Sequence, residues 1–145
     1  MAKLGIHLIT TNHLLLLRLT KTSMSIKYTK LTKNEISDYL ENKKNDRDYI
    51  VYIPGLLCKN KYDFFRITAQ SFTFPTYFGY NWDSFDECIN DLSWLNFSSL
   101  IIVLDDFSQL FAYEKEARRV LMLVLFEMNT YWSNKDVIIE IMLNN

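Results

Sequence analysis

The chain has 145 residues, of which 49% are hydrophobic and 23% charged, and this composition is typical of one globular domain with a real core. Its formal net charge is only −1 at pH 7, so the total charge gives no reason to expect binding to nucleic acid or to an anionic membrane. The two cysteines, Cys58 and Cys88, form no CxxC pair and no disulfide scaffold. Both are predicted to be reduced and buried, which fits a cytoplasmic protein.

Residues 1–45 are predicted to be an N-terminal extension, and residues 46–145 the folded domain. The apolar run Leu14–Leu17 is far too short to span a bilayer. No small-residue cleavage site follows it, as a secretory signal peptide would require. Met24 could serve as the start of translation, in which case residues 1–23 would not be made; otherwise we expect them to be unpacked or weakly packed.

The end of this extension predicts a short helix over residues 32–41. Thr32 has the side chain of an N-cap, and Glu35 stands at the position that completes a capping box. Residues 42–48 are polar and predict a linker. A short apolar strand follows at residues 49–53 and is stopped by a Pro-Gly pair.

The remainder of the chain alternates between helical patterns and apolar runs. In chain order we expect a helix at 63–72, a helix at 81–92, a strand at 100–104, a helix at 113–131 and a strand at 137–143. The second strand is apolar throughout, as expected of a strand covered on both faces. The alternation predicts an α/β fold, with a small three-stranded parallel sheet packed by helices.

The helix predicted after the N-cap Asn81 has one apolar face and one acidic face. The apolar face consists of residues at i, i+4 and i+7, which are Phe85, Ile89 and Leu92. The acidic face consists of residues at i, i+4 and i+8, which are Asp83, Glu87 and Asp91. Like charges at this spacing cost about 0.2–0.5 kcal/mol per pair, and the helix has no Lys or Arg to relieve them.

The near-zero net charge conceals an acidic block. Residues 1–66 contain twelve Lys and Arg against six Asp and Glu, whereas residues 67–114 contain seven acids and no base. Residues 115–145 contain four of each. Two interpretations stay open: the fold could bring the basic first part alongside the block, or the block could meet a cationic partner.

Three functions could use such an acidic face. Asp105 and Asp106, at the end of a predicted strand, could join it in a metal site, but no D-x-D-x-D-G ligand loop is present. Paired carboxylates could serve an acid/base enzyme, yet the only histidines are His7 and His13 in the extension, and no G-x-S-x-G or P-loop occurs. The third use, a binding face for a basic protein, suits exposed carboxylates beside loop aromatics best.

The stretch FPTYFGYNWDSFDECINDL, residues 74–92, resembles the signature of the barstar family, whose members are intracellular inhibitors of secreted microbial ribonucleases. The matching positions are Pro75, Tyr77, Phe78, Gly79, Asn81, Asp83 and Cys88. The resemblance extends more loosely over about residues 49–143. It implies a three-stranded parallel sheet with helices, and a loop and helix that enter the cationic active site of a ribonuclease.

The resemblance also implies a role for each matching residue. Tyr77 takes the place of the loop tyrosine that packs on the enzyme, and Glu87 that of the central acid that replaces the RNA phosphate. The expected partner-binding residues are Tyr77, Phe78, Gly79, Asn81, Asp83, Asp86, Glu87 and Asp91. Gly79 could instead be needed only for a positive φ. We expect a monomer with no catalytic residue, cofactor or metal, and no direct contact with nucleic acid or membrane.

Several residues depart from the family pattern. Asp86 replaces a frequent tryptophan, and Glu87 is one methylene longer than aspartate, which extends its reach by about 1.3–1.5 Å. Asp91 and Leu92 stand where well-known members have Gly-Trp, and Glu127 is the nearest counterpart of a late-helix glutamate. An immunity protein against another basic toxin, or a member that does not inhibit, therefore stays open beside the ribonuclease inhibitor.

Overall fold

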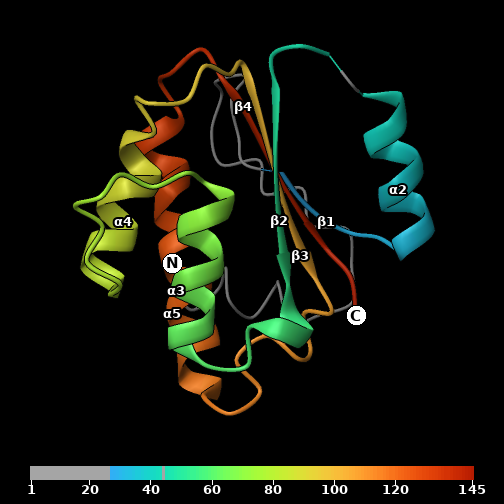
Figure 1. The fold of residues 1–145 in the computed structure, drawn as a ribbon. Coiled ribbons are helices and arrows are strands. Elements are labelled where there is room, and N and C mark those ends of the chain that lie inside the picture. The colour runs from blue at the N-terminus through green and yellow to red at the C-terminus, as the bar shows by residue number, and fades with distance from the viewer. Residues whose placement is uncertain (1–26, 44) are drawn as a thin grey trace.

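A single parallel sheet organises the protein, for which the computed structural model describes residues 27–43 and 45–145. Its four strands lie in the order β1-β4-β3-β2 (Figure 1). They are β1 (Lys27–Lys30), β2 (Asp48–Pro54), β3 (Ser99–Asp105) and β4 (Ile138–Leu143). All three pairings are parallel, so the predicted α/β class and strand direction are confirmed. The expectation for residues 1–23 lies outside the described residues.

The predicted number of three strands is wrong, because β1 adds a fourth strand at the edge of the sheet. It pairs with β4, with Lys27 opposite Glu140 and Lys30 opposite Leu143. The sequence KYTK contains no apolar run, so periodicity gives no strand signal there. Lysine is nevertheless common in edge strands, where it discourages pairing with other chains. The start of the domain at residue 46 stays a prediction.

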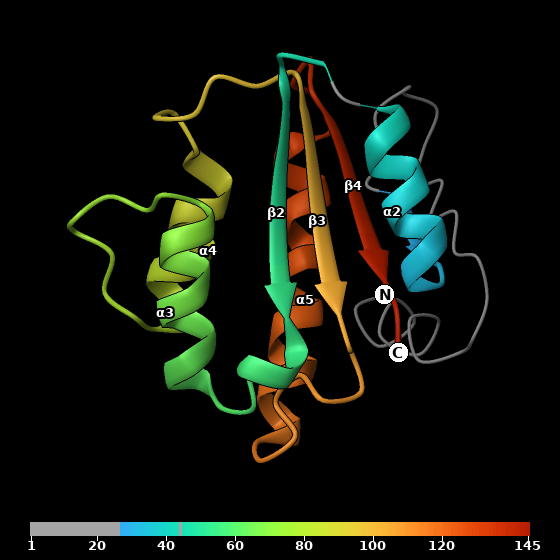
Figure 2. The same ribbon diagram turned by 45° about the vertical axis from the view of Figure 1, so that its right-hand side comes forward.

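The helices cover the two faces of the sheet unequally. Of the helices in the described residues, α2 (Lys33–Asn42) covers one face, whereas α3 (Lys61–Ser71), α4 (Trp82–Asp91) and α5 (Lys115–Trp132) cover the other (Figures 1 and 2). The capping box predicted for α2 is present, with Thr32 and Glu35 each accepting from the other's backbone N–H. No helix in the described part of the chain is long and apolar enough to cross a membrane.

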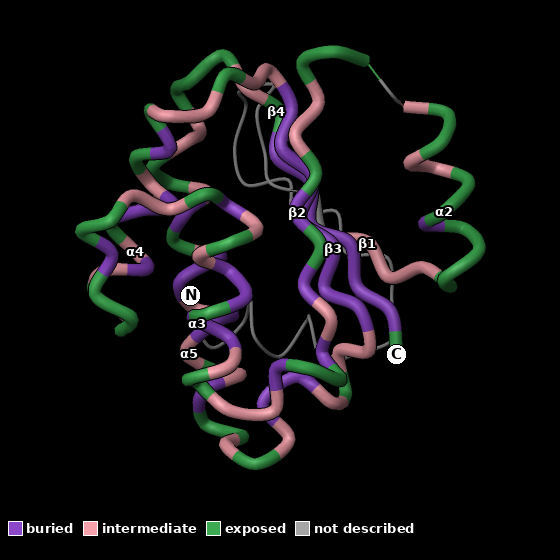
Figure 3. Tube along the Cα trace, viewed as in Figure 1, coloured by how far each residue is buried: buried purple, intermediate pink, exposed green. Residues whose placement is uncertain are grey.

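The main core lies between the sheet and the three helices α3, α4 and α5. All seven residues of β3 are buried, as expected for its apolar sequence (Figure 3). Phe64 of α3 is at the centre of an aromatic cluster, with its ring centroid 4.8 Å from that of Phe111 and 5.3 Å from that of Phe85. Such aromatic burial supplies much of the stability of a small domain. Cys58 and Cys88 are free and buried, as predicted.

The contact between α2 and the sheet is smaller and more polar. Ile36 is the one buried residue of α2, and it packs with Ile101, Val103 and Met142 of the sheet. At the other end of the helix, Lys43 Nζ lies 2.6 Å from Glu140 Oε1, and the hydroxyl of Tyr39 donates to the same carboxylate. The Glu140 side chain, which belongs to a residue only 8% exposed, thus has an ion-pair partner and a hydrogen-bond donor, as buried polar groups require.

Candidate partner-binding site on helix α4

Helix α4 begins and ends close to where its sequence predicts. Asn81 is the N-cap, and its side-chain oxygen accepts from the backbone N–H of Ser84 at 2.8 Å. Leu92 ends the helix in the left-handed conformation, with φ 47°, and its N–H donates to the carbonyl of Cys88. The predicted apolar stripe is buried, since Phe85, Ile89 and Leu92 are each at most 1% exposed.

Because that stripe faces the core, the acidic row of α4 is left at the surface. We use this name for Asp83, Glu87 and Asp91, which are all exposed. Among the described residues, the ion pairs involve Asp63, Asp105, Asp106 and Glu140, and none involves the acidic row. Within the described residues, the fold therefore pairs Asp105 and Asp106 of the acidic block with Lys33 and gives the acidic row of α4 no ion pair.

Asp86 stands apart from the acidic row. It is half-buried, and its Oδ1 accepts from the side-chain amide of Asn90, one helical turn later, at 3.1 Å. The carbonyl oxygen of that amide is buried and has no hydrogen-bond partner within the described structure. Asp86 is therefore already engaged within the helix, and its contact with a partner stays a prediction.

The two aromatic residues of the loop before α4 occupy different environments. Phe78 is only 5% exposed, and its ring packs on Phe74 at 4.7 Å and on Phe65 at 6.1 Å. Tyr77 is 62% exposed, and its hydroxyl lies 3.5 Å from Oδ2 of Asp91, at the end of the acidic row. Phe78 thus supports the loop from beneath, whereas Tyr77 offers its ring to solvent beside the carboxylates.

A positive φ would explain a glycine at position 79, but Gly79 does not have one. The positive φ of this loop belongs to Tyr80, with φ 54°. Gly79 allows a close approach, because a Cβ there would lie 3.0 Å from Asn81 Nδ2, which would have to shift slightly, and 3.5 Å from the side chain of Ser84, which is an ordinary contact. The Gly79 N–H donates to Ser84 Oγ at 2.8 Å, and Asn81 Nδ2 donates to the Gly79 carbonyl at 3.1 Å. Asn81 and Ser84 therefore fasten the loop to the first turn of α4.

Sequence reasoning missed Tyr80 as a surface feature of this site. Its side chain is 58% exposed, and its ring lies 4.9 Å from that of Phe78. The available signal was its position, since an aromatic residue stands between Gly79 and the N-cap Asn81, where the loop is exposed.

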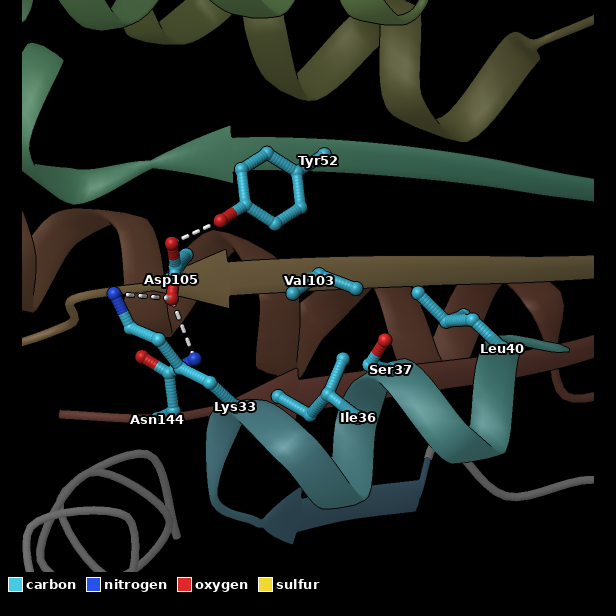
Figure 4. Close-up of a pocket in the computed structure, with 8 residues that line it drawn as sticks. All are labelled: Lys33, Ile36, Ser37, Leu40, Tyr52, Val103, Asp105 and Asn144. Carbon is cyan, nitrogen blue, oxygen red and sulfur yellow. Dashed lines mark hydrogen bonds and ion pairs between the residues drawn. The ribbon is translucent and has the colours of Figure 1, made fainter.

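The carboxyl end of the sheet contains a second polar cluster, on the opposite face from α4. A cavity of about 230 Å³ opens there between α2 and the strands (Figure 4). Asp105 at its polar end accepts from the Tyr52 hydroxyl and from the Asn144 side-chain amide. Lys33 Nζ lies 3.7 Å from Asp105 and 3.1 Å from Asp106.

These contacts bear on the hypothesis of a metal site at Asp105 and Asp106. A hydroxyl, an amide and an ammonium group all donate to this carboxylate pair, so its oxygens already have partners. Across residues 27–43 and 45–145, no group of three or more His, Cys, Asp and Glu side chains is placed to hold a metal ion. These polar contacts join α2 to the sheet, and we call the cluster of Lys33, Tyr52, Asp105, Asp106 and Asn144 the polar latch.

The latch predicts a pH dependence of stability. Burial favours the protonated form of Asp105, but the donors Tyr52, Asn144 and Lys33 outweigh it and lower the pKa of this carboxyl below its usual value. A pKa lowered by folding contributes stability above the unfolded pKa of about 3.9, and this contribution is lost as the pH falls through the folded pKa. We expect Asp105→Asn to remove that contribution and to lower stability at neutral pH by about 1–3 kcal/mol.

Urea unfolding of both proteins between neutral pH and about pH 3 measures this effect. The difference in free energy of unfolding should shrink as the wild-type carboxyl becomes protonated. A difference that stays constant over the whole range would contradict a charged Asp105 in the folded protein.

A comparison with known families covers the loop and the helix of the candidate partner-binding site. Residues 49–144 match the family model described as Barstar (barnase inhibitor), which spans the chain from β2 to the end of β4 and contains the loop and α4. The match leaves out β1 and α2. No curated protein matches the chain. Since the family model covers more than half of the sequence, the chain belongs to the barstar family.

Proposed function

We propose that this protein inhibits a basic ribonuclease secreted by the producing microbe, and that it protects the cytoplasm of that cell. The observation that supports this most is the acidic row, which consists of three exposed carboxylates without a cation among the described residues. A ribonuclease must bind the RNA phosphates through cationic side chains. A helix that presents uncompensated carboxylates can take the place of those phosphates and neutralise the cleft.

The inhibitor role assigns a task to each part of the site. Glu87 lies at the middle of the row and is proposed to replace the phosphate, with Asp83 and Asp91 one turn to either side. Tyr77 packs on the enzyme, and Phe78 holds the loop from the core side. Gly79 and Asn81 shape the loop, so that it and the first turns of α4 enter the cleft together. Asp86 is proposed to contact the rim of the enzyme.

Binding alone is sufficient for this function. The family is named for an inhibitor, and the proposed site needs no cofactor, metal ion or reacting group. We propose that the protein acts as a monomer and contacts the ribonuclease rather than RNA. The direct test is to titrate the purified protein into basic ribonucleases from the producing organism's medium and to follow the cleavage of RNA.

A second candidate function arises from the departures at Asp86, Glu87 and Asp91. These residues carry more negative charge, or a longer side chain, than the family pattern, and they would suit a toxin with a different cationic surface. The same titration separates the candidates: an immunity protein against another toxin would bind a basic protein and leave ribonuclease activity unchanged.

The acidic row also predicts how fast the complex forms. Attraction between an acidic face and a cationic cleft accelerates association, and added salt screens it because the Debye length falls from about 10 Å at 0.1 M to about 3 Å at 1 M. We expect the association rate to fall several-fold over this range, with a much smaller change in the dissociation rate. Stopped-flow association rates that do not depend on salt would point to an apolar interface.

A further inference from the structure

A positive φ is unfavourable for residues with a side chain, and five such residues occur in the described structure. They are Thr73, Tyr80, Leu92, Asp106 and Phe111. Burial accounts for two of them, because Leu92 and Phe111 are at most 1% exposed and their packing holds the backbone in place. For each of the other three, some other contact or use must offset the strain.

Thr73 and Asp106 have such contacts. The hydroxyl of Thr73 lies 3.2 Å from that of Tyr49, and Asp106 pairs with Lys33. Aspartate, in addition, tolerates the left-handed conformation better than most residues. Tyr80 differs from both, because it combines a bulky side chain with 58% exposure, and its ring contact among the described residues is with Phe78.

Three hydrogen bonds hold the residues that flank Tyr80. Before it, the Gly79 N–H donates to Ser84 Oγ at 2.8 Å, and the Gly79 carbonyl accepts from Asn81 Nδ2 at 3.1 Å. After it, Asn81 caps α4 by accepting from the Ser84 N–H at 2.8 Å. These bonds fix the backbone on both sides of Tyr80 in the free protein, where its side chain is 58% exposed.

We propose that Tyr80 is a specificity-determining contact of the partner-binding surface, and that Ser84 is the positioning residue that fixes it. The proposal rests on the function proposed above. A positive φ at an exposed residue with a bulky side chain is a strained conformation, and such strain clusters at functional residues. Tyrosine is also among the residues that dominate binding energies at protein interfaces.

The surroundings of Tyr80 indicate what it meets. The residue lies two positions before the first residue of α4, on the same exposed segment as Tyr77 and next to the helix that carries the acidic row. A partner drawn to that row is rich in arginine and lysine on the facing surface. The ring of Tyr80 therefore receives an arginine side chain at the rim of the cationic cleft, where a guanidinium stacks on an aromatic face.

Two substitutions at Tyr80 test the contact. Tyr80→Asn keeps a residue that adopts a positive φ readily and removes the ring, whereas Tyr80→Phe keeps the ring. We expect Tyr80→Asn to be at least as stable as the wild type in urea but to inhibit the ribonuclease about tenfold less tightly or worse. Tyr80→Phe should inhibit within about threefold of the wild type, as should Tyr113→Asn, which removes a tyrosine that is 75% exposed outside the loop and α4.

A substitution of Ser84 tests the positioning in the free protein. Ser84→Ala removes the acceptor of the Gly79 N–H, so hydrogen exchange of that amide should accelerate while the amides in the middle of α4 keep their protection. Ser84→Ala should also bind more weakly, mainly through slower association, because fewer molecules present Tyr80 in the bound conformation. Unchanged exchange at Gly79 would overturn the role of Ser84.

The outcomes separate this inference from the proposed function. If the wild type inhibits the ribonuclease and Tyr80→Asn inhibits it equally well, the contact is overturned and the function stands. If the wild type inhibits no basic ribonuclease, the function and the contact are both overturned. A loss of stability in Tyr80→Asn that matches its loss of binding would make Tyr80 a structural residue and overturn the inference as well.

Discussion

Replacing Glu87 by Ala should weaken ribonuclease inhibition by at least about tenfold, or 1.4 kcal/mol, while leaving the free protein as stable as before. Glu87 is exposed and has like charges four residues away on either side, at Asp83 and Asp91. Its removal relieves two repulsive pairs and favours the helix, each by a few tenths of a kcal/mol. In the complex, by contrast, the cations of the cleft would lose the group that neutralises them.

Matched variants distinguish charge from bulk at this position. Glu87→Gln keeps the length of the side chain and removes its charge, so it should bind nearly as poorly as Glu87→Ala. Glu41→Ala removes an exposed helical glutamate from α2, on the other face of the sheet, and should leave inhibition unchanged. Urea melts and inhibition titrations measure both properties. A stability loss above about 1 kcal/mol would make Glu87 structural, and inhibition preserved within a few-fold would remove its central role.

Gly55→Ala should show the opposite behaviour, with a loss of stability of about 3 kcal/mol and little effect on the binding of the molecules that remain folded. Gly55 begins the 3-10 helix η1 (Gly55–Leu57) that follows β2. A Cβ at this position would lie 2.3 Å from the backbone carbonyl oxygen of Asp106 and 2.6 Å from that of Asp105. Both oxygens belong to the main chain where β3 ends, so neither can move aside like a flexible side chain.

Gly79→Ala is the matched control, because its Cβ would meet the side chain of Asn81 at 3.0 Å and no main-chain atom within the same distance. We expect it to cost less stability than Gly55→Ala and to weaken inhibition more, since it disturbs the loop. Urea unfolding at neutral pH, followed by inhibition titration of the folded fraction, measures both effects. A Gly55→Ala protein as stable as the wild type would show that the end of β3 can shift to accommodate the methyl group.

The sequence predicted the elements whose signals are local. The apolar runs identified the strands β2, β3 and β4 to within a residue or two, and Asn81 marked the beginning of α4. The buried stripe of α4 followed from helical spacing, which also placed the acidic row on another face. That the row has no ion pair within the described structure could not be predicted, because it depends on where Lys and Arg from distant segments come to lie.

The features that sequence reasoning missed depend on tertiary contacts. Strand β1 is a strand because β4 offers it an edge, and its own residues carry no apolar pattern. The left-handed conformation is adopted by Tyr80 rather than by Gly79, in a loop that the side chains of Asn81 and Ser84 fasten to the first turn of α4. The latch brings Lys33 against Asp105 and against Asp106, which is 73 positions away, and no local pattern reveals such a contact.

The pairing of β1 with β4 has a consequence for the order of folding during synthesis. The first strand and α2 leave the ribosome early, but their partner strand is made late: Tyr39 of α2 and Glu140 of β4, which share a hydrogen bond, are 101 residues apart. Closing so long a loop is slow, because its entropy must be lost before the contacts form. Residues from β2 to α5 can therefore assemble first around Phe64. Strand β4 then pairs with β3 on one side and with β1 on the other, so the β1 edge of the sheet forms last.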